Sequence, residues 1–270
     1  MRPLKFLDKL VEEKLQAVLA SEFSSAISAS QPQDIFVAGY PKSGNTWMQY
    51  LGAGIQYGIP GDFLTDRLAN ELAPDVHERR YHRRYGSFNF FKTHHLPRPE
   101  YRRVIYLVRD GRDAMVSYFA MHRSQKLGGT LEEMVKEGKH VFPGPWWEHV
   151  RAWTANPHGA EMMTLRYEDL IAQPLQELRR VCAFAHLERD DELLERIIRS
   201  NSFSDVKERA RQYAAMGHQE WAKPVNQNFF RKGKVGSYRE EMPADLIAWF
   251  TQAAAAELKQ FGYDTQPGAP

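Results

Sequence analysis

The 270-residue sequence predicts an α/β fold, a single domain in which a central parallel β-sheet is flanked by helices. Two observations predict it. Short apolar segments alternate along the chain with longer segments of helical periodicity, which is typical of βαβ units. One apolar segment, residues 104–108, is hydrophobic throughout, as strands are when both faces of a sheet are buried. The sequence contains no internal repeat and no Pro/Ser/Gly-rich linker, so we expect one domain.

The predicted elements follow in chain order. Residues 1–30 place apolar side chains at helical spacing among charged ones and lack the continuous apolar core of a secretion signal, so we predict a docking helix. The domain is predicted to span residues 31–264, and residues 265–270 to form a disordered tail. Strands are predicted at residues 34–38, 88–93, 103–108 and 161–166. Helices are predicted at residues 45–57, 111–123, 146–156, 168–185, 190–200 and 244–261.

Composition narrows the class of protein only slightly. Apolar residues make up 43% of the chain and the net charge is +2, which is too small to indicate a nucleic-acid partner. No apolar run reaches the length of a membrane span. The single cysteine, Cys182, lies in an apolar helical context and is predicted to be buried. A lone cysteine excludes an internal disulfide and favours a reducing, cytoplasmic location.

The most informative segment is residues 36–47, in which an apolar strand runs into a glycine-containing turn and then an amphipathic helix. This order aims backbone N–H groups and a helix N-terminus at one anion. Lys42 adds a positive charge, and Ser43 and Thr46 add hydroxyl donors. The segment therefore predicts a phosphate or sulfate site. An ordinary strand–helix turn with a solvated lysine is the alternative.

The position of the lysine separates this loop from that of nucleotide triphosphatases. Gly39 and Gly44 have the spacing of G-x-x-x-x-G-K-[ST], but Asn45 follows the second glycine and Lys42 precedes it. Residues 41–47, Pro-Lys-Ser-Gly-Asn-Thr-Trp, resemble instead the 5′-phosphosulfate loop of the cytosolic-type sulfotransferases, P-K-[SA]-G-[TN]-T-W. The resemblance implies a P-loop-like architecture, with 3′-phosphoadenosine 5′-phosphosulfate (PAPS) as donor and 3′-phosphoadenosine 5′-phosphate (PAP) as product.

A second constellation follows the strand at residues 103–108. Arg109 ends the strand, Gly111 opens a helix, and Ser117 lies two turns along it. An arginine fork with a nearby hydroxyl suits a terminal phosphate, and the pair resembles the family's 3′-phosphate motif. A structural salt bridge is the alternative for Arg109. Asp113 matches an acidic family position, but we expect it to act only as a charge at the helix N-terminus.

A third segment, residues 229–236, combines positive charge with two glycines. It resembles the family's R-K-G-x-x-G segment, which closes over the same 3′-phosphate; a solvated basic loop is the alternative. The family usually continues with Asp-Trp-Lys, whereas this chain has Ser237-Tyr238-Arg239. Without a clear counterpart of the family's Lys-Thr-Val-Glu dimer motif, both a monomer and a homodimer stay open.

The resemblance also implies aromatic contacts with the adenine, because Trp47, Tyr167, Ser202 and Phe203 match family positions around the base. Together, the residues assigned to nucleotide binding are Lys42, Ser43, Gly44, Asn45, Thr46, Trp47, Arg109, Ser117, Tyr167, Ser202, Phe203, Phe230, Arg231, Lys232 and Gly233.

Residues 90–97 supply the expected catalytic groups. They resemble the family's K-T-H-x-P motif, and we assign His94 as the general base that deprotonates an acceptor hydroxyl. Lys42 is expected to stabilise the bridging oxygen of the donor, and Lys92 the transferring sulfuryl oxygens. His95 is an addition to the motif that either lines the acceptor pocket or faces away. No set of His, Cys, Asp and Glu has zinc-site spacing, and this transfer is expected to need no metal.

The resemblance implies a small-molecule hydroxyl compound as the acceptor, and the dense aromatic residues favour a phenol, an alcohol or a lipid-like compound. Two other functions are possible. A P-loop kinase or nucleotide triphosphatase would require Mg²⁺ and would leave His94 and the Arg231 segment unexplained. A non-catalytic nucleotide-binding protein would keep both phosphate sites but has no need of Lys42, Lys92 and His94.

Overall fold

The computed structural model describes residues 24–202 and 234–265. Its central sheet has four parallel strands in the order β4-β2-β5-β6, and a separate two-stranded sheet pairs β1 with β3 in antiparallel fashion. The strands are β1 (Ser24–Ala26), β2 (Ile35–Gly39), β3 (Tyr81–Arg83), β4 (Phe90–Thr93), β5 (Arg103–Val108) and β6 (Glu161–Arg166). The predicted α/β class with a parallel sheet is confirmed.

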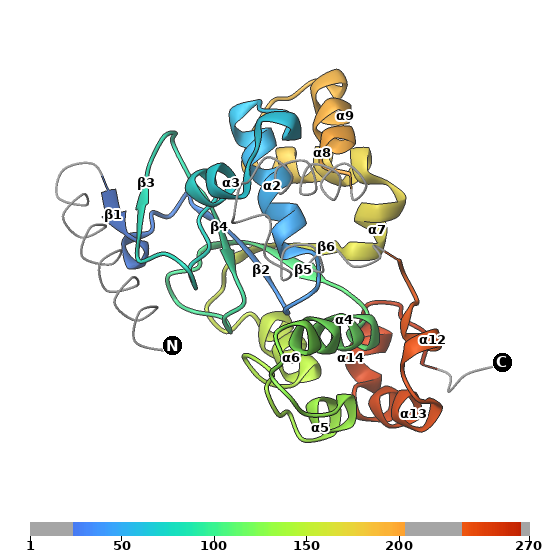
Figure 1. The fold of residues 1–270 in the computed structure, drawn as a ribbon. Helices are drawn as coiled ribbons and strands as arrows, with labels where there is room; N and C mark the ends of the chain where they lie inside the picture. Colours follow the sequence, from blue (N-terminus) through green and yellow to red (C-terminus); the bar gives the residue numbers. More distant parts are fainter. Residues whose placement is uncertain (1–23, 203–233, 266–270) are drawn as a thin grey trace.

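Helices occupy most of the remaining described chain (Figure 1). They are α2 (Asn45–Tyr57), α3 (Asp66–Leu72), α4 (Gly111–Ser124), α5 (Leu131–Lys136), α6 (Trp146–Ala155), α7 (Tyr167–Ala172), α8 (Pro174–Ala185), α9 (Asp191–Ser200), α12 (Tyr238–Glu241), α13 (Ala244–Ala253) and α14 (Ala255–Gln260), with short 3-10 turns η1 (Ile27–Ala29) and η2 (Gly61–Phe63).

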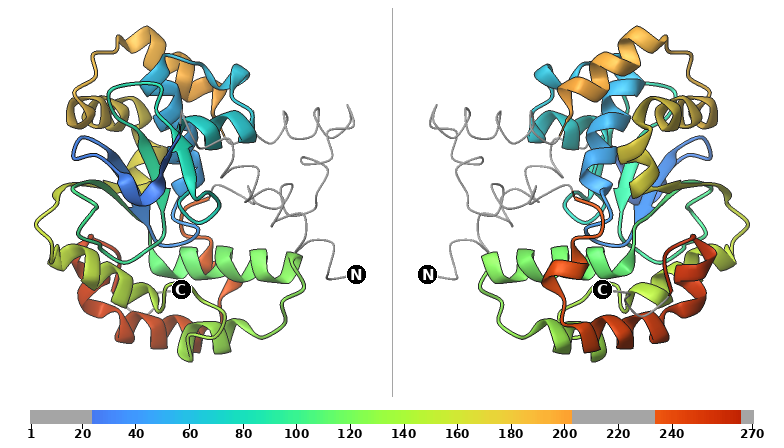
Figure 2. Two further views of the ribbon diagram at one scale, coloured as in Figure 1. Left: turned by 90° about the vertical axis from the view of Figure 1, so that its left-hand side faces the viewer. Right: turned by 90° about the vertical axis from the view of Figure 1, so that its right-hand side faces the viewer.

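Two helical layers cover the two faces of the central sheet (Figures 1 and 2). Helices α2, α3, α8 and α9 lie on one side, and α4, α5, α6, α13 and α14 lie on the other. The alternation of side chains along β2 explains how both layers are held. Ile35 and Val37 belong to one apolar core, whereas Phe36 and Ala38 belong to the second. The strand is therefore apolar at every position because it serves two cores.

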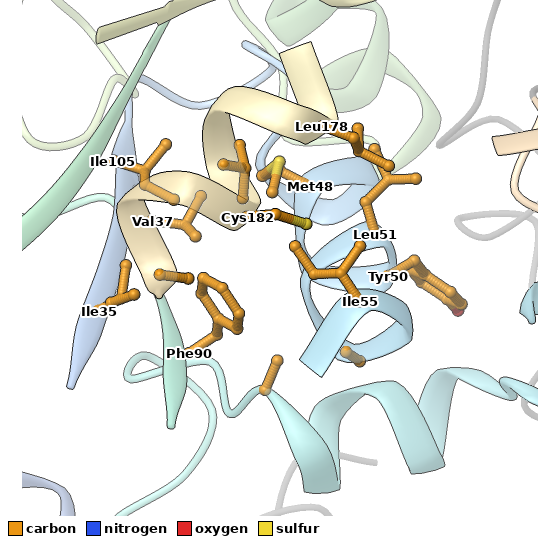
Figure 3. Close-up of a cluster of buried hydrophobic side chains, with 14 of the residues drawn as sticks. Ile35, Val37, Met48, Tyr50, Leu51, Ile55, Phe90, Ile105, Leu178 and Cys182 are labelled. Carbon is orange, nitrogen blue, oxygen red and sulfur yellow. The ribbon is translucent and has the colours of Figure 1, made fainter. Parts of the chain in front are cut away.

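The first core packs α2 against the sheet and α8 (Figure 3). Met48 and Leu51 of α2 meet Val37 of the sheet and Leu178 of α8, and all four side chains are buried. Cys182 lies in the same core as a buried free thiol, as its apolar context predicts. This packing fixes α2, and with it the loop that precedes α2.

Two long predicted helices are each divided. The helix predicted at residues 168–185 breaks at Gln173, because Pro174 has no N–H and starts a new helix, α8, at its first position. The helix predicted at residues 244–261 breaks at Ala254, where φ is −110°, although Ala254 still donates to Phe250 O at 2.9 Å.

Several short elements were not predicted from the sequence, namely α3, α5, α12, β1, β3 and the 3-10 turns η1 and η2. Of the predicted N-terminal helix, residues 1–23 lie outside the described residues, and Ser24–Ala26 form strand β1. Within the described ranges, no helix is both long and apolar enough to cross a membrane.

The order of the strands places a topological switch point at β2. The chain passes from β2 to β4 on one side and then to β5 on the other, so the direction of winding changes at β2. In open α/β sheets, ligands bind outside the carboxyl ends of the strands at such a switch point. The segments that follow β2, β4, β5 and β6 therefore converge on one edge of the sheet.

The start of α4 tolerates no side chain larger than that of glycine. A methyl group at Gly111 would lie 2.5 Å from Phe250 Cζ and 2.5 Å from Trp146 Cδ2. We expect Gly111→Ala to lower the free energy of unfolding by about 1–3 kcal/mol through overpacking. Urea unfolding measures this. Gly86→Ala is the control, because its nearest neighbour would be 3.7 Å away. Equal losses in the two variants would contradict the steric explanation.

Candidate functional site

The four strands of the central sheet bring the predicted site residues to one edge. The loop before α2 follows β2, His94 follows β4, Arg109 follows β5, and Tyr167 follows β6. Because parallel strands end on the same side, segments that are far apart in sequence become neighbours there. The site lies between the two helical layers, at the switch point beside β2.

The loop after β2 has a tightly wound backbone. Ser43 N donates to Tyr40 O at 3.1 Å, and Gly44, at φ +100°, is the N-terminal cap of α2. Lys42 has φ +69°, a left-handed conformation that costs a non-glycine residue about 1–3 kcal/mol. Such outliers cluster at functional sites. The first N–H groups of α2 lack intrahelical partners, as at every helix start, so the loop and helix together form an anion cradle.

Arg109 connects three parts of the site. Its guanidinium donates from Nη1 to Lys42 O at 3.0 Å and from Nη2 to Lys234 O at 3.3 Å. Its Cζ lies 4.4 Å from the centre of the Tyr167 ring. The arginine therefore holds the turn after β2, the chain that follows the undescribed segment, and the aromatic residue after β6. Lys42, Arg109 and Tyr167, all assigned to nucleotide binding from the sequence, thus lie in contact around the Arg109 guanidinium.

Three residues assigned to nucleotide binding have buried polar atoms without a hydrogen-bond partner in the part of the chain that the structure describes. Ser43 Oγ, Arg109 Nε and Asn45 Oδ1 are buried and make no hydrogen bond with the described residues. A buried polar atom without a partner costs about 1–3 kcal/mol. Two of these atoms, on Ser43 and Arg109, are donors that suit the oxygens of a bound phosphate. The arrangement fits an anionic nucleotide.

The aromatic residues assigned to the base lie beside this cradle. Trp47 Nε1 donates to Asn201 O at 2.8 Å, and the Trp47 and Tyr167 rings meet edge to face at 6.3 Å. Ser202 follows Asn201 directly, at the end of the described range. Trp47, Tyr167 and Ser202 are thus drawn together from three separate segments. Phe203, Phe230, Arg231, Lys232 and Gly233 lie outside the described residues.

Asp113 has a larger structural role than the predicted helix-terminal charge. Its carboxylate is fully buried and accepts hydrogen bonds from Gly236 N at 2.7 Å, Ser237 Oγ at 3.1 Å and Tyr238 N at 2.9 Å. It thereby fixes the chain after the basic segment against α4, close to Arg109, with which it forms an ion pair at 3.8 Å. Ser117 lies one turn further along α4 and is also buried.

His94 is held in one tautomer. Its Nδ1 lies 2.8 Å from Gly39 O, and because a carbonyl oxygen only accepts, Nδ1 carries the proton. Nε2 then has a free lone pair, which is what a general base needs. Burial, together with the nearby Lys92 ammonium, lowers the pKa of His94 below its usual value of about 6.5. The imidazole is therefore neutral at physiological pH.

Lys92 has a partner that the sequence did not indicate. Its Nζ forms an ion pair with Asp75 Oδ2 at 2.8 Å, and the two side chains are only 11% and 5% exposed. Although burial opposes ionisation, the Lys92 ammonium keeps the pKa of Asp75 below its ordinary value. Asp75 and His77, which contacts His94, are the residues that sequence reasoning missed. They belong to an irregular segment without any motif.

His95 lies beside the base. Its Nδ1 is 2.9 Å from Tyr101 Oη, and its ring is 4.3 Å from that of His77 and 6.0 Å from that of Phe142. Burial lowers the pKa of His95 to about 4. Together His77, His95 and the exposed Phe142 place flat, uncharged rings next to His94. Among the residues described, no group of three or more His, Cys, Asp or Glu is placed to hold a metal ion.

Comparison with known proteins gives consistent matches. The sulfotransferase domain family matches residues 32–262. The chain is 30% identical over 237 residues to mouse sulfotransferase 1B1, covering 78% of this chain and 77% of the mouse protein. It is 26% identical over 231 residues to human sulfotransferase 1C2, covering 78% of each protein.

Solved structures with the same fold were also found. Mouse sulfotransferase SULT7A1 in complex with PAP superposes with a TM-score of 0.62 at 24% identity, covering 85% of both chains. Retinol dehydratase, in complex with androsterone and PAP, superposes with a TM-score of 0.63 at 21% identity, covering 87% of this chain and 82% of that protein.

Proposed function

Because the chain belongs to the sulfotransferase family, we propose that it transfers the sulfuryl group of PAPS to the hydroxyl group of a small-molecule acceptor. The observation that carries this proposal is the contact between the anion loop and the base. His94 Nδ1 donates to Gly39 O at 2.8 Å, and Gly39 lies two residues before the first residue of the Pro-Lys-Ser-Gly-Asn-Thr-Trp loop. A neutral imidazole therefore stands beside the anion cradle.

We propose that the site binds the nucleotide at both of its phosphate ends. Lys42, Ser43 and the N-terminus of α2 would hold the 5′-phosphosulfate, and Arg109 with Ser117 would hold the 3′-phosphate. The unpartnered, buried Ser43 Oγ and Arg109 Nε support this assignment, as do the PAP complexes of mouse SULT7A1 and retinol dehydratase. Trp47 and Tyr167 would flank the adenine. Phe203, Phe230 and residues 231–233 complete the proposed set from the sequence resemblance.

The chemistry divides among three side chains. The bound donor supplies the sulfuryl group, and the acceptor oxygen forms the new bond to sulfur as the bond to the phosphate oxygen breaks. His94 Nε2 accepts the proton of the acceptor hydroxyl during this attack. Lys42 stabilises the negative charge that develops on the leaving oxygen, and Lys92 holds the sulfuryl oxygens. The proposed transfer places the proton on His94 and the developing negative charge beside Lys42, and it uses no metal ion.

For the acceptor we propose a phenol, an alcohol or a lipid-like hydroxyl compound. The rings of His77, His95 and Phe142 beside His94 support a flat or apolar molecule, because burial keeps both flanking imidazoles uncharged. Androsterone in the retinol dehydratase structure is one such compound bound by a relative of the same fold.

We further propose that residues 31–264 act as one catalytic domain, with residues 1–30 as a docking helix and residues 265–270 as a tail. The buried free thiol of Cys182 supports action in the reducing cytoplasm. The net charge of +2 supports a small-molecule partner in preference to nucleic acid. A monomer and a homodimer are both compatible with this function.

The central prediction is metal-independent transfer that depends on His94. Labelled PAPS, a chelator and a panel of phenols and alcohols should yield sulfated product. His94→Ala should lower kcat about 10²–10⁴-fold, the usual contribution of a general base, while PAP binding persists. His158→Ala, at an exposed histidine, is the matched control. Activity that requires ATP and Mg²⁺ would identify a kinase or triphosphatase, and nucleotide binding without turnover a non-catalytic protein.

Arg109 should contribute to donor binding and not to acceptor binding. Since hydrogen bonds to charged groups are worth about 1.5–3 kcal/mol, Arg109→Ala should weaken PAP binding about 10- to 100-fold. Isothermal titration with PAP and the acceptor KM measure the two effects. Arg109→Lys, which keeps the charge, and the exposed Arg123→Ala serve as controls. Equal losses for donor and acceptor would contradict the assignment to the 3′-phosphate.

The pH profile should reflect the lowered pKa of His94. A base is active when unprotonated, so kcat/KM is retained above its pKa and falls as the pH drops through it. Because burial and Lys92 lower this pKa, the acid limb should lie below pH 6.5, the ordinary histidine value. The measurement needs a non-ionising alcohol as acceptor. An acid limb above pH 6.5 would argue against His94 as the base.

A further inference from the structure

We infer that residues 74–77, called here the brace segment, position both Lys92 and His94 for the reaction. This inference rests on the proposed function, which gives Lys92 and His94 their chemical roles. Asp75 holds the Lys92 ammonium, and His77 holds the main chain of His94. Asp75 and His77 are therefore positioning residues, which act through Lys92 and His94.

The brace segment adds a short piece of parallel strand to the sheet. Lys92 N donates to Pro74 O at 2.9 Å, and Val76 N donates to Lys92 O at 3.0 Å. Asp75 and Lys92 form an isolated parallel bridge. The segment therefore covers the outer edge of β4, opposite β2, at the residue that supplies the catalytic ammonium. Edge strands without a partner leave main-chain groups unpaired, so this pairing fixes the end of β4.

The two carboxylate oxygens of Asp75 have separate partners. Oδ1 accepts from His77 N at 2.9 Å, and Oδ2 faces Lys92 Nζ at 2.8 Å. The main chain of Asp75 is held in turn, because its N–H donates to Asn70 Oδ1 at 2.9 Å. A carboxylate anchored in this way gives the Lys92 ammonium one defined position. An ammonium has three N–H donors, so two remain for the sulfuryl oxygens.

His77 acts on the neighbouring catalytic residue. Its Nε2 accepts from His94 N at 2.9 Å, and the two imidazole rings stack with their centres 5.4 Å apart. His94 is thus fixed at two points, its main chain by His77 and its ring by Gly39 O. With both points fixed, Nε2 of His94 has one direction in which to accept the acceptor proton.

Energetics favour a positioning role over a purely stabilising one. Taking two charges out of water costs about as much as their attraction returns, so a buried ion pair is a weak source of net stability. The position of a reacting group has a much larger effect on rate, because a shift of about 1 Å can slow a reaction about 10²-fold. The contacts of the brace segment end on the two residues proposed for catalysis, which is where placement matters.

A double-mutant cycle in kcat tests the role of Asp75. Asp75→Asn should lower kcat about 10- to 100-fold while PAP affinity stays within about twofold, since misplacement affects the transfer step. In a Lys92→Met background, adding Asp75→Asn should change kcat less than about twofold, because the partner is gone. Glu71→Gln is the matched control, a carboxylate in the same region that pairs with Arg79. An equal loss in both backgrounds would show that Asp75 acts independently of Lys92 and would overturn its role.

A pair of substitutions tests His77 without disturbing Asp75. Gln places an amide oxygen near the position of Nε2, so His77→Gln should keep kcat within about threefold, whereas His77→Phe removes the acceptor and should lower kcat about tenfold or more. Thermal unfolding of both variants checks that the fold is retained. Equal kcat values for Gln and Phe would overturn the role of His77.

The outcomes separate this inference from the proposed function. If Lys92→Met and His94→Ala keep full activity, the proposed catalytic roles fail, whatever the brace variants do. If these two variants lose activity while Asp75→Asn and His77→Phe remain at wild-type kcat, the proposed function stands and the brace inference alone is overturned.

Discussion

One carbonyl oxygen joins the parts of this site. Gly39 O, at the end of β2, lies 2.8 Å from His94 Nδ1 and 3.3 Å from Asn45 Nδ2. It sets the tautomer of His94 and ties Asn45, the first residue of α2, to the end of the sheet. Residue 39 has to be glycine, because a Cβ there would lie 2.6 Å from Leu107 O. The close packing of β2 against β5 and the orientation of the His94 ring therefore both depend on Gly39.

The electrostatics of the site differ between the residues proposed for binding and the one proposed for proton transfer. Positive charge is carried by Lys42, Lys92 and Arg109, around the loop proposed to hold the anionic donor. The histidine beside them stays neutral, because burial and the neighbouring ammonium both disfavour its charged form. Under the proposed function this has a consequence: the Lys92 ammonium that is proposed to hold the sulfuryl oxygens also helps to keep the His94 imidazole unprotonated.

Family membership, established by the match to residues 32–262, agrees with this division of roles. It supports sulfuryl transfer over the kinase alternative, and it accounts for a lysine that precedes the second glycine of the loop. Other contacts lie near the motif. His95 follows His94, and a separate segment brings Asp75 to Lys92 and His77 to His94.

Local sequence predicted much of the fold because strands, glycine turns and amphipathic helices are written in neighbouring residues. Strands β2, β4, β5 and β6 start within two residues of their predicted starts, and α2 has its predicted bounds. The break before Pro174 was not predicted, although the sequence carries its signal, since proline disrupts a helix interior and is tolerated in the first turn of a new one. The division at Ala254 was not predicted either, because alanine is a good helix former and the break there carries no local signal.

The sequence by itself determined which residues carry charge, donors and a titratable ring at the ends of the strands. Only the tertiary structure decided their partners. Asp113 meets Gly236 across 123 residues, and His77 meets His94 across 17. Such contacts follow from strand order and from the path of irregular segments, which no periodic pattern encodes. A side chain's chemistry is local, whereas its hydrogen-bond partner depends on how the whole sheet is assembled.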